Sequence, residues 1–293
     1  MKFTICIPTY NRGYIIKRTI ESVVRQSYKN FEIIIIDDGS TDNTREIVHS
    51  IQNKYDVEMY YLFQENQGKH IALNNGIKNA KGDFFIILDS DDMLIENALE
   101  LMKNEWESIP MSQHPLYCGV IGKCINTNGN DIGKKFAVEN ISYIDFHFVL
   151  GPFGDCCECI RLDVLRAFEF PQIENVKFVP EAYVFDQIGI KYKLKTTNEI
   201  LKIVEYLDDG ITLNNNHFIR KNALGYIYYY SLIIEKILPI YKKNIPYKRK
   251  IIIFLKYWRT IKHCDNKNSI PKIKIPFYWK FLKGFTFILE RGK

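Results

Sequence analysis

Residues 31–44, FEIIIIDDGSTDNT, decide the fold because they read as a buried strand that ends in two carboxylates, a glycine turn and the start of a helix. Residues 33–36 are apolar on both faces, as a central strand covered by helices on both sides requires. Residues 84–88 repeat the pattern, because an apolar run is followed there by Asp89-Ser90-Asp91-Asp92. Two such strands place their acids along one edge of an open α/β sheet, where ligands of such sheets bind. We therefore expect the active site at this edge.

The first 105 residues alternate between strand-like and helix-like patterns. This alternation predicts an α/β fold with a mostly parallel, doubly wound (Rossmann-like) sheet and helices on both faces. Pro8 ends the first strand because proline has no N–H to donate, and Thr41 or Asp42 is suited to cap the second helix. The expected strands are residues 3–7, 31–37, 57–63 and 83–88, and the expected helices are residues 14–26, 41–52 and 68–80, with a further helix from Leu94.

The pattern loosens after residue 116. We expect strands at residues 117–126, 157–161 and 199–206, and a helix within residues 177–193. After residue 216 the sequence becomes helical, basic and aromatic. Breaks in these helices are expected at the prolines, because proline interrupts helical hydrogen bonding. These are Pro239, Pro246, Pro271 and Pro276.

Composition indicates a globular protein. The chain has 293 residues, of which 46% are hydrophobic, so it can fill a sizeable core. No run of 18 apolar residues occurs, and the most lipophilic stretch, residues 225–238, carries Glu235 and Lys236, so a membrane-spanning helix is not expected. The segment before Pro8 is too short for the apolar core of a secretory signal, and we expect the protein in the cytoplasm.

Seven cysteines, an odd number without paired metal-type spacing, favour free thiols over a disulfide framework. Cys156, Cys157 and Cys159 admit a zinc site, but no histidine or second cysteine pair lies at a suitable distance in the sequence. We therefore favour a packing role for these small side chains.

The net charge of +6 conceals a division of the chain. Residues 217–293 contain 18 Lys or Arg against 3 Asp or Glu, a balance of +15, whereas residues 1–216 contain 22 against 31, a balance of −9. Aromatic side chains lie among the cations, as in YWR at residues 257–259 and FYWK at 277–280. Short helices of this composition suit a membrane interface with anionic lipid, and a helical subdomain with solvated lysines is the alternative. No nucleic-acid-binding motif appears, so no nucleic-acid partner is expected.

Two further motifs accompany the acidic strand ends: ICIPTYNR at residues 5–12 and Gly68-Lys69 at a helix start. Together these motifs resemble glycosyltransferase family 2, the inverting sugar-nucleotide transferases with a GT-A fold. The resemblance covers the first 105 or so residues strongly and those to about 216 more loosely. It implies a GT-A domain over residues 1–216, with a nucleotide-binding half (1–105) and an acceptor half (106–216), followed by a helical, basic C-terminal region (217–293).

The acidic cluster suits a divalent cation. Sugar transfer from a nucleotide needs neutralisation of the departing diphosphate, which a metal supplies, and hard cations often take only one or two protein carboxylates beside phosphate oxygens and waters. The resemblance implies that Asp91 binds Mn²⁺ or Mg²⁺ and that Asp89 lies near the ribose, with Asp92 as support. Capping of a helix from Leu94 by Ser90 and Asp92 is the alternative. Three acids in four positions would, however, repel one another without a cation.

Other nucleotide contacts are expected from the second strand end and the glycine–lysine turn. A carboxylate accepts the imide N–H of uracil, and the resemblance implies this role for Asp38 rather than Asp37, with an Asx turn of Asp38 at Gly39 as the alternative. The N–H groups at the helix start, together with Lys69, attract phosphate or the base edge, although the arginine that the family has near positions 73–74 is absent. The expected nucleotide-binding residues are Pro8, Thr9, Tyr10, which stacks on the base or packs in its loop, Asn11, Arg12, Asp38, Gly68, Lys69, Asp89 and Ser90.

An inverting transferase places a carboxylate as general base opposite the departing diphosphate. The resemblance implies Glu181 for this role, in FVPE at residues 178–181. Many relatives have adjacent Glu-Asp here, whereas this chain has Glu181 and then Asp186. An acid at a helix start is the alternative for Glu181.

For the remaining acidic residues the sequence leaves more than one role open. Asp92, Asp155 and Glu158 are expected to reach hydroxyls of the acceptor or of the donor sugar, and an ion pair of Glu158 with Arg161 is an alternative. The DDG sequence at residues 208–210 is consistent with a turn, a donor-loop element or a metal contact. His217 is left out of the metal set, because a lone histidine is more often a surface residue.

These expectations describe a metal-dependent inverting glycosyltransferase that transfers a sugar from a UDP-sugar to a glycan or lipid-linked acceptor, in the synthesis of a surface polysaccharide such as capsule or lipopolysaccharide. Through its basic region it would contact the inner face of the cell membrane peripherally. Two rivals remain: a sugar nucleotidyltransferase, which has a different glycine-rich N-terminal loop, and a non-catalytic glycan- or nucleotide-binding module of the same fold. A dinucleotide dehydrogenase is disfavoured, because no G-x-G-x-x-G follows the first strand.

Overall fold

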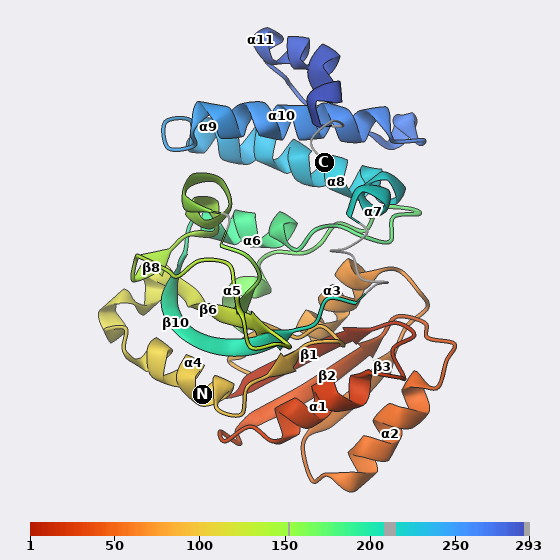
Figure 1. Ribbon diagram of the computed structural model, residues 1–293, viewed down its shortest axis with the longest axis vertical. Helices are drawn as coiled ribbons and strands as arrows, with labels where there is room; N and C mark the ends of the chain where they lie inside the picture. Colours follow the sequence, from red (N-terminus) through yellow and green to blue (C-terminus); the bar gives the residue numbers. More distant parts are fainter. Residues whose placement is uncertain (152, 208–214, 290–293) are drawn as a thin grey trace.

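The computed structural model describes residues 1–151, 153–207 and 215–289. They form a ten-stranded sheet with helices on both faces (Figure 1) and the main strand order β3-β2-β1-β4-β9-β6-β10-β5. The first four strands pair in parallel, as the alternation of strand and helix patterns predicts. Their bounds are β1 Phe3–Thr9, β2 Phe31–Asp37, β3 Met59–Phe63 and β4 Phe84–Ile87. The expected fold class is confirmed.

The second half of the sheet has mixed pairing. β9 is antiparallel to both β4 and β6, β10 is parallel to β6, and β5 is antiparallel to β10. Because β5 directly follows Asp92, this pairing brings β10 beside the acidic loop after β4. The bounds are β5 Met93–Leu94, β6 Tyr117–Asn126, β7 Asp131–Ile132, β8 Asn140–Ile141, β9 Cys156–Arg161 and β10 Lys193–Val204.

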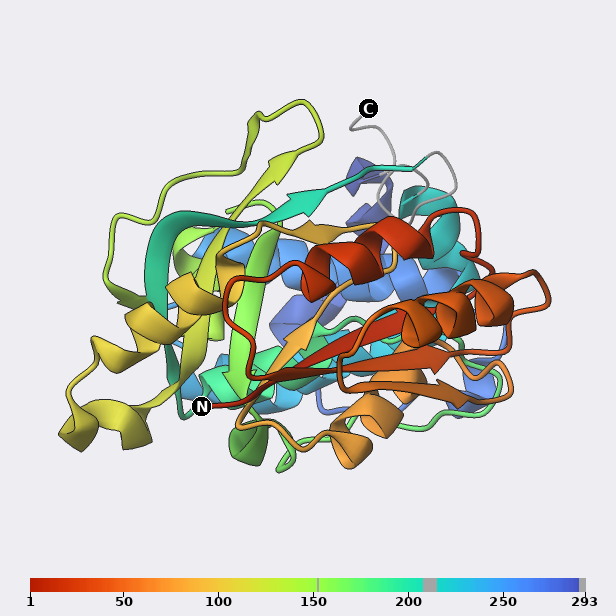
Figure 2. The same ribbon diagram turned by 90° about the horizontal axis from the view of Figure 1, so that it is seen from below.

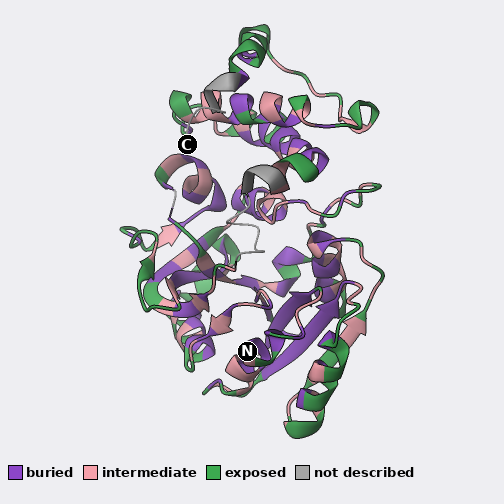
Figure 3. Cartoon of the chain, turned by 45° about the vertical axis from the view of Figure 1, so that its right-hand side comes forward, coloured by how far each residue is buried: buried purple, intermediate pink, exposed green. Residues whose placement is uncertain are grey.

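Alternate side chains of the central strands enter two separate hydrophobic cores. Ile33 and Ile35 of β2 face the core that includes side chains of α1, α2 and α4, whereas Ile34 and Ile36 face the core that includes α3 and α6. Figure 3 shows these strands buried beneath helices whose outer surfaces are exposed. β2 is therefore the doubly covered central strand that its sequence predicts. The helix bounds are α1 Ile16–Val24, α2 Thr44–Lys54, α3 Lys69–Asn79, α4 Ala98–Glu107, α5 Leu162–Leu165 and α6 Ala182–Gly189.

The C-terminal region forms a helical layer on the side of the sheet that carries α6 (Figure 1 and Figure 2). Ile227 and Phe254 of this layer belong to the same hydrophobic core as Val184 of α6. Trp279 stacks on Phe254, with ring centroids 4.6 Å apart. The layer therefore packs on the rest of the chain through a shared apolar core. Its helices are α7 Asn215–Lys221, α8 Ala223–Leu232, α9 Leu238–Ile240, α10 Tyr247–Lys262 and α11 Phe277–Lys280.

Shorter helical segments complete the chain. Two are π-helical, Asp145–Leu150 and Ile233–Ile237, and three are 3₁₀-helical, Met111–Leu116, Lys267–Ser269 and Phe281–Leu289. Within the described part of the chain, no helix combines the length and the hydropathy that crossing a membrane requires.

The helix expected from Leu94 is wrong. Met93 and Leu94 form β5, which pairs with the backbone of Ile203 and Lys202, and α4 begins only at Ala98. The unpaired edge of β10 offers hydrogen bonds that a local pattern does not reveal. β10 itself begins at Lys193, earlier than the strand expected at residues 199–206.

Pro239 does not break the helix as expected. The helical path continues from α8 through the π-helical segment into α9, where Pro239 lies in the first turn. A missing N–H is tolerated at that position. Pro246 and Pro276 do interrupt the helical layer, since each directly precedes a helix as its N-cap residue.

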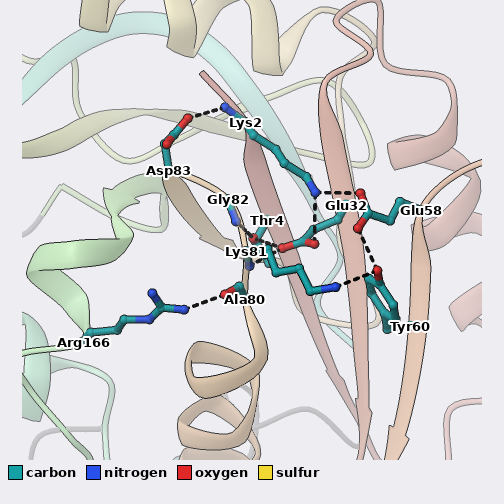
Figure 4. Close-up of polar contacts among 10 residues, drawn as sticks. All are labelled: Lys2, Thr4, Glu32, Glu58, Tyr60, Ala80, Lys81, Gly82, Asp83 and Arg166. Atoms are coloured by element: carbon teal, nitrogen blue, oxygen red, sulfur yellow. Dashed lines mark hydrogen bonds and ion pairs between the residues drawn. The ribbon is translucent and has the colours of Figure 1, made fainter.

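A polar cluster joins the amino ends of the first four strands, at the sheet edge opposite the acidic loop (Figure 4). Glu32 is fully buried and accepts hydrogen bonds from Thr4 Oγ1 and the Lys81 N–H, both at 2.5 Å. Lys2 Nζ lies 3.3 Å from Glu32 and 2.6 Å from Glu58. A buried carboxylate is thereby paired and hydrogen-bonded, so we assign this cluster a structural role.

Candidate active site

A cleft of about 530 Å³ opens at the carboxyl ends of β1, β2 and β4, the edge that the sequence predicts. α6, β9, β10 and the π-helical turn Asp145–Leu150 contribute its other walls. Most of the expected site residues line it: Pro8, Thr9, Tyr10, Arg12, Asp38, Lys69, Asp89, Ser90, Asp91, Asp92, Asp155, Glu158 and Glu181. Asn11 and Gly68 do not. Acidic residues from segments far apart in the sequence therefore line the same cleft.

Asp38 is buried at the end of β2, and its carboxylate already has hydrogen-bond donors. Its Oδ1 accepts the Gln67 N–H and its Oδ2 accepts the Gly68 N–H, each at 2.8 Å. The side chain therefore fixes the loop that leads into α3. The turn after β2 is made by Asp37, whose Oδ1 accepts the Ser40 N–H at 2.7 Å. The alternative that assigned this turn to Asp38 is wrong.

Gly68 shapes the site without lining the cleft. Its φ of 95° lies in the region that favours glycine, and a Cβ there would lie 2.0 Å from the Lys177 carbonyl oxygen. Any other residue would displace the turn that carries Lys69.

The loop after β1 forms the opposite lip of the cleft. Asn11 has a φ of 53°, and its Oδ1 accepts the Thr41 N–H at 2.8 Å, so it ties this loop to the loop after β2. Thr9 and the half-exposed Tyr10 line the cleft. The Thr9 hydroxyl is buried without a hydrogen-bond partner within the described chain.

The acidic loop after β4 is held by its backbone. Thr19 Oγ1 donates to the Ser90 carbonyl at 2.8 Å, and Arg18 Nη2 donates to the Asp91 carbonyl at 2.9 Å. Arg18 also pairs with Glu205. α1 thus positions the loop through its carbonyl groups, and Asp91 lines the cleft.

Lys69 joins the acidic loop to α6. Its Nζ lies 2.5 Å from Asp89 Oδ1 and 2.8 Å from Glu181 Oε1. Desolvation alone would lower the pKa of Lys69, but the two carboxylates raise that pKa above its usual value. Desolvation alone would raise the pKa of Asp89, but Lys69 and Lys202 lower it. One ammonium group therefore holds the expected ribose-side acid beside the expected base.

Helix capping does not account for Glu181. The residue occupies the N-cap position of α6, but its side chain makes no capping hydrogen bond. Its carboxylate instead faces Lys69 and lines the cleft.

Lys202 of β10 is a second buried cation of the cleft. Its Nζ lies 2.8 Å from Asp92 Oδ2. Burial raises the pKa of Asp92 to about 6, against the opposing effect of Lys202. Burial likewise raises the pKa of Glu158 to about 7, where Lys202 opposes the rise and Glu181 adds to it. Asp92 therefore pairs with Lys202 of β10. Its expected support of the metal and its contact with a sugar hydroxyl stay predictions.

Arg161 pairs with Asp163 and not with Glu158, so the ion-pair alternative for Glu158 is wrong. Glu158 instead lines the cleft from β9. The neighbouring Asp155 accepts a hydrogen bond from the Tyr206 hydroxyl at 2.6 Å.

Sequence reasoning missed three residues that build this site: Arg18, Lys202 and His147. His147 lines the cleft, and its Nδ1 lies 2.5 Å from Asp186 Oδ1. The only local signal is Lys202, a charge within the apolar run of residues 200–204. Arg18 and His147 acquire their roles from partners distant in the sequence, which no motif identifies.

A divalent metal fits this site only if the phosphate oxygens of a bound nucleotide complete its coordination shell. Across residues 1–151, 153–207 and 215–289, no group of three or more His, Cys, Asp or Glu is arranged to hold a metal. Asp91 nevertheless lines the cleft, and burial followed by the charge of Asp89 raises its pKa. A cation relieves such repulsion, and Mg²⁺ or Mn²⁺ binds through one or two carboxylates when phosphates complete its shell.

The zinc site that the cysteine cluster admits is not formed among the described residues. The cysteines expected to be free thiols are free in the structure. Cys157 and Cys159 are buried in the core with α1 and α4, in the packing role that the sequence favours. Residues 208–210 lie outside the described residues, as does the side chain of His217.

The family described as Glycosyl transferase family 2 matches residues 4–153, just over half of the chain. The chain belongs to glycosyl transferase family 2. A Haemophilus influenzae protein named as an uncharacterized glycosyltransferase is 40% identical over 258 residues, which cover 84% of this chain and 98% of that protein. The family region contains β1 to β4 and the acidic loop, whereas Glu158 and Glu181 of the cleft lie beyond it.

A family relative with a more specific name comes from Campylobacter jejuni. This protein, named GalNAc(5)-diNAcBac-PP-undecaprenol beta-1,3-glucosyltransferase, is 34% identical over 188 residues, which cover 62% of this chain and 56% of that protein. The chain therefore spans just over half the length of this relative.

Solved structures share the fold. TarS of S. aureus (residues 1–349) in complex with UDP has a TM-score of 0.58 at 16% identity, covering 98% of this chain and 88% of that chain. The mannosyltransferase PcManGT from Pyrobaculum calidifontis, in complex with GDP-Man and Mn²⁺, has a TM-score of 0.62 at 16% identity, covering 99% and 81%.

Proposed function

We propose that this family 2 protein is an inverting glycosyltransferase that transfers a sugar from a UDP-sugar to a glycan or lipid-linked acceptor in the synthesis of a surface polysaccharide. The observation that carries the proposal is that Asp38, Asp91 and Glu181, from three separate segments, line one cleft. A volume of about 530 Å³ suits a ligand of sugar-nucleotide size. The UDP complex of TarS and the undecaprenol-linked glycan in the name of the C. jejuni relative support the choice of donor and acceptor.

In this proposal Asp91 would hold Mn²⁺ or Mg²⁺, and Asp89 would lie on the ribose side. When bound, such a cation would supply positive charge against the charge that develops on the departing diphosphate. The Mn²⁺ in the PcManGT complex supports a divalent cation. Lys69, beside Asp89, adds a fixed positive charge at the same end of the cleft.

Glu181 acts as the general base. It accepts the proton of the acceptor hydroxyl as that oxygen forms its bond to the anomeric carbon and the bond from this carbon to the diphosphate oxygen breaks. Attack on the face opposite the diphosphate inverts the anomeric configuration. Lys69 keeps the Glu181 carboxylate within the cleft.

The C-terminal layer supplies a peripheral membrane contact. Tyr247, Phe277, Tyr278 and Phe281 are exposed on this layer, among the lysines and arginines that give residues 217–293 their positive balance. Exposed aromatic rings and basic side chains bind the interface of an anionic membrane. Such a contact would bring the cleft to a lipid-linked acceptor.

A donor screen tests the proposed function. UDP release from UDP-glucose, UDP-galactose, UDP-GlcNAc and UDP-GalNAc is measured with Mn²⁺ and with EDTA. We expect slow, Mn²⁺-dependent release from at least one donor, and no release above background from the Asp91→Asn variant. Release that EDTA leaves unchanged would contradict the metal-dependent mechanism.

The same screen separates the rivals. Calorimetric binding of UDP without any turnover, across the four donors and a panel of acceptor glycans, would favour a non-catalytic module. Formation of a UDP-sugar from UTP and a sugar 1-phosphate would favour a nucleotidyltransferase.

A further inference from the structure

His147 lines the cleft but has no part in the mechanism proposed above. It projects from the π-helical turn Asp145–Leu150, and π-helical turns are rare and frequently lie at functional sites. Its side chain is 26% exposed, so a ligand in the cleft can reach it.

A hydrogen bond to Asp186 of α6 holds the imidazole of His147 in place. Its Nδ1 lies 2.5 Å from Oδ1 of Asp186, a fully buried residue of α6. The other carboxylate oxygen of Asp186 accepts the Tyr229 hydroxyl at 2.9 Å. A carboxylate that accepts the Nδ1 proton leaves Nε2 as the outward end of the ring. In the chain as described, no group forms a hydrogen bond with Nε2.

Asp186 also favours the charged form of the ring. Burial alone would lower the pKa of His147, but Asp186 raises it, and Glu158 of β9 adds to the rise. The packing around the ring is otherwise aromatic, with the Tyr143 ring stacked at 6.1 Å and the Phe146 ring at 5.0 Å. In this charged form the ring presents Nε2–H, its outward end, as a hydrogen-bond donor.

The wall around His147 has the chemistry of a sugar subsite. Phe146 and Phe185 supply apolar surface, and Asp155 and Glu158 supply carboxyl groups. A pyranose presents C–H faces that pack on such surface and hydroxyls that both donate and accept hydrogen bonds. Carboxylates satisfy the donating part of these hydroxyls, and an imidazolium satisfies the accepting part.

We propose that His147 donates a hydrogen bond through Nε2 to a hydroxyl of the sugar carried by the donor nucleotide, and that Asp186 and Tyr229 are positioning residues that hold the ring for this contact. The inference rests on the proposed function and identifies a specificity-determining residue of the same cleft. The competing account is that these three residues only join the π-helical turn to the helices behind it.

Paired calorimetric titrations test the contact. UDP, and the four UDP-sugars of the donor screen, are titrated with Mn²⁺ into the wild type, His147→Ala, His147→Gln and Asp186→Asn. His114→Gln is the matched control, because its ring bonds the Ile109 carbonyl outside the cleft. We expect UDP affinities within twofold throughout. UDP-sugar affinity should fall at least tenfold relative to UDP in His147→Ala and Asp186→Asn, with part of the loss recovered in His147→Gln, whose amide is also a donor.

A second readout separates positioning from a structural role. We expect the ¹³Cε1 resonance of His147 to titrate at lower pH in Asp186→Asn than in the wild type, and to shift on addition of UDP-sugar more than on addition of UDP. Tyr229→Phe, which removes a single hydroxyl, replaces Asp186→Asn if the latter does not fold. A lower melting temperature with unchanged relative UDP-sugar affinity in His147→Ala would overturn the proposal. A wild type that binds none of the five nucleotides would overturn the proposed function, and this inference with it.

Discussion

Lys69 connects the two sides of the cleft through a single ammonium group. The glycine–lysine motif predicts attraction to phosphate, whereas the structure pairs Lys69 with Asp89 and Glu181. Both observations are consistent with one role, because a diphosphate would bring its negative charge to the same end of the cleft. Lys69 therefore pairs with two acids, and in the proposed function it would also supply charge to the donor.

Replacing Lys69 with methionine removes this charge and keeps most of the side-chain volume. Asp89 and Glu181 then face the cleft without their shared cation, so we expect kcat/KM to fall about 100-fold, equivalent to about 2.7 kcal/mol. Lys81→Met is the control, since Lys81 lies at the opposite sheet edge, where it contacts Tyr60. Steady-state kinetics that show no difference between the two variants would remove Lys69 from the mechanism.

Glu181→Gln tests the general base. The amide cannot accept the proton of the acceptor hydroxyl, so we expect kcat to fall by about 10²-fold to 10⁴-fold. Calorimetric affinity for UDP should be unchanged, because the substitution preserves the shape of the side chain. The exposed Glu174, substituted to Gln, serves as the nearby control. Wild-type turnover in Glu181→Gln would exclude it as the base.

How far the site could be predicted depends on whether a residue belongs to a motif. Asp91 and Lys69 follow recognisable strand ends and turns, and the structure places both in the cleft. His147 has no such signal, because its partner Asp186 lies 39 residues away. For Asp38 the motif predicts the position in the cleft but not the hydrogen-bond partners, which are the Gln67 and Gly68 N–H groups.

Helices and strands followed the sequence wherever their own pattern determines them. β2 has the doubly apolar pattern of a covered strand, and it is buried on both faces. β5 has no such pattern, because two residues become a strand only when the edge of β10 is beside them. Pro239 likewise reads locally as a break, but the π-helical segment before it lets the helix continue.

The polar cluster at the amino ends of the strands makes a prediction about stability. Glu32→Ala leaves Lys2 and the Thr4 hydroxyl without their buried partner, so we expect the free energy of unfolding to fall by about 3–5 kcal/mol. Glu58→Gln should cost under about 1 kcal/mol, since that carboxylate is partly solvated. Chemical denaturation measures both values. Equal effects of the two substitutions would show that Glu32 does not stabilise the buried end of β2.

In the whole molecule, the cleft is lined by residues of the acidic part of the chain, 1–216, and the positive charge is concentrated in residues 217–293. The sequence predicts this division of charge, and the structure adds that the layer shares a hydrophobic core with α6. That shared core could not be predicted, because the apolar residues of α8 and α10 read equally well as a separate unit. The division into residues 1–216 and 217–293 stays a proposal.

The membrane contact gives a prediction for the whole protein. We expect co-sedimentation with vesicles that contain phosphatidylglycerol and little with phosphatidylcholine alone. The double variant Phe277→Ser/Phe281→Ser should lose most of this binding, because these exposed rings would enter the interface. Met111→Ser, at an exposed residue outside the layer, is the control. Binding that the double variant retains in full would assign the layer a purely structural role.

The central claim is that Asp91 and a nucleotide diphosphate share one divalent cation. Electron paramagnetic resonance of free Mn²⁺ tests it directly, in titrations of the wild type and Asp91→Asn with and without UDP. We predict weak Mn²⁺ binding to the wild type alone, at least tenfold tighter binding with UDP, and loss of that gain in Asp91→Asn. The same UDP-dependent gain in Asp91→Asn as in the wild type would contradict the account.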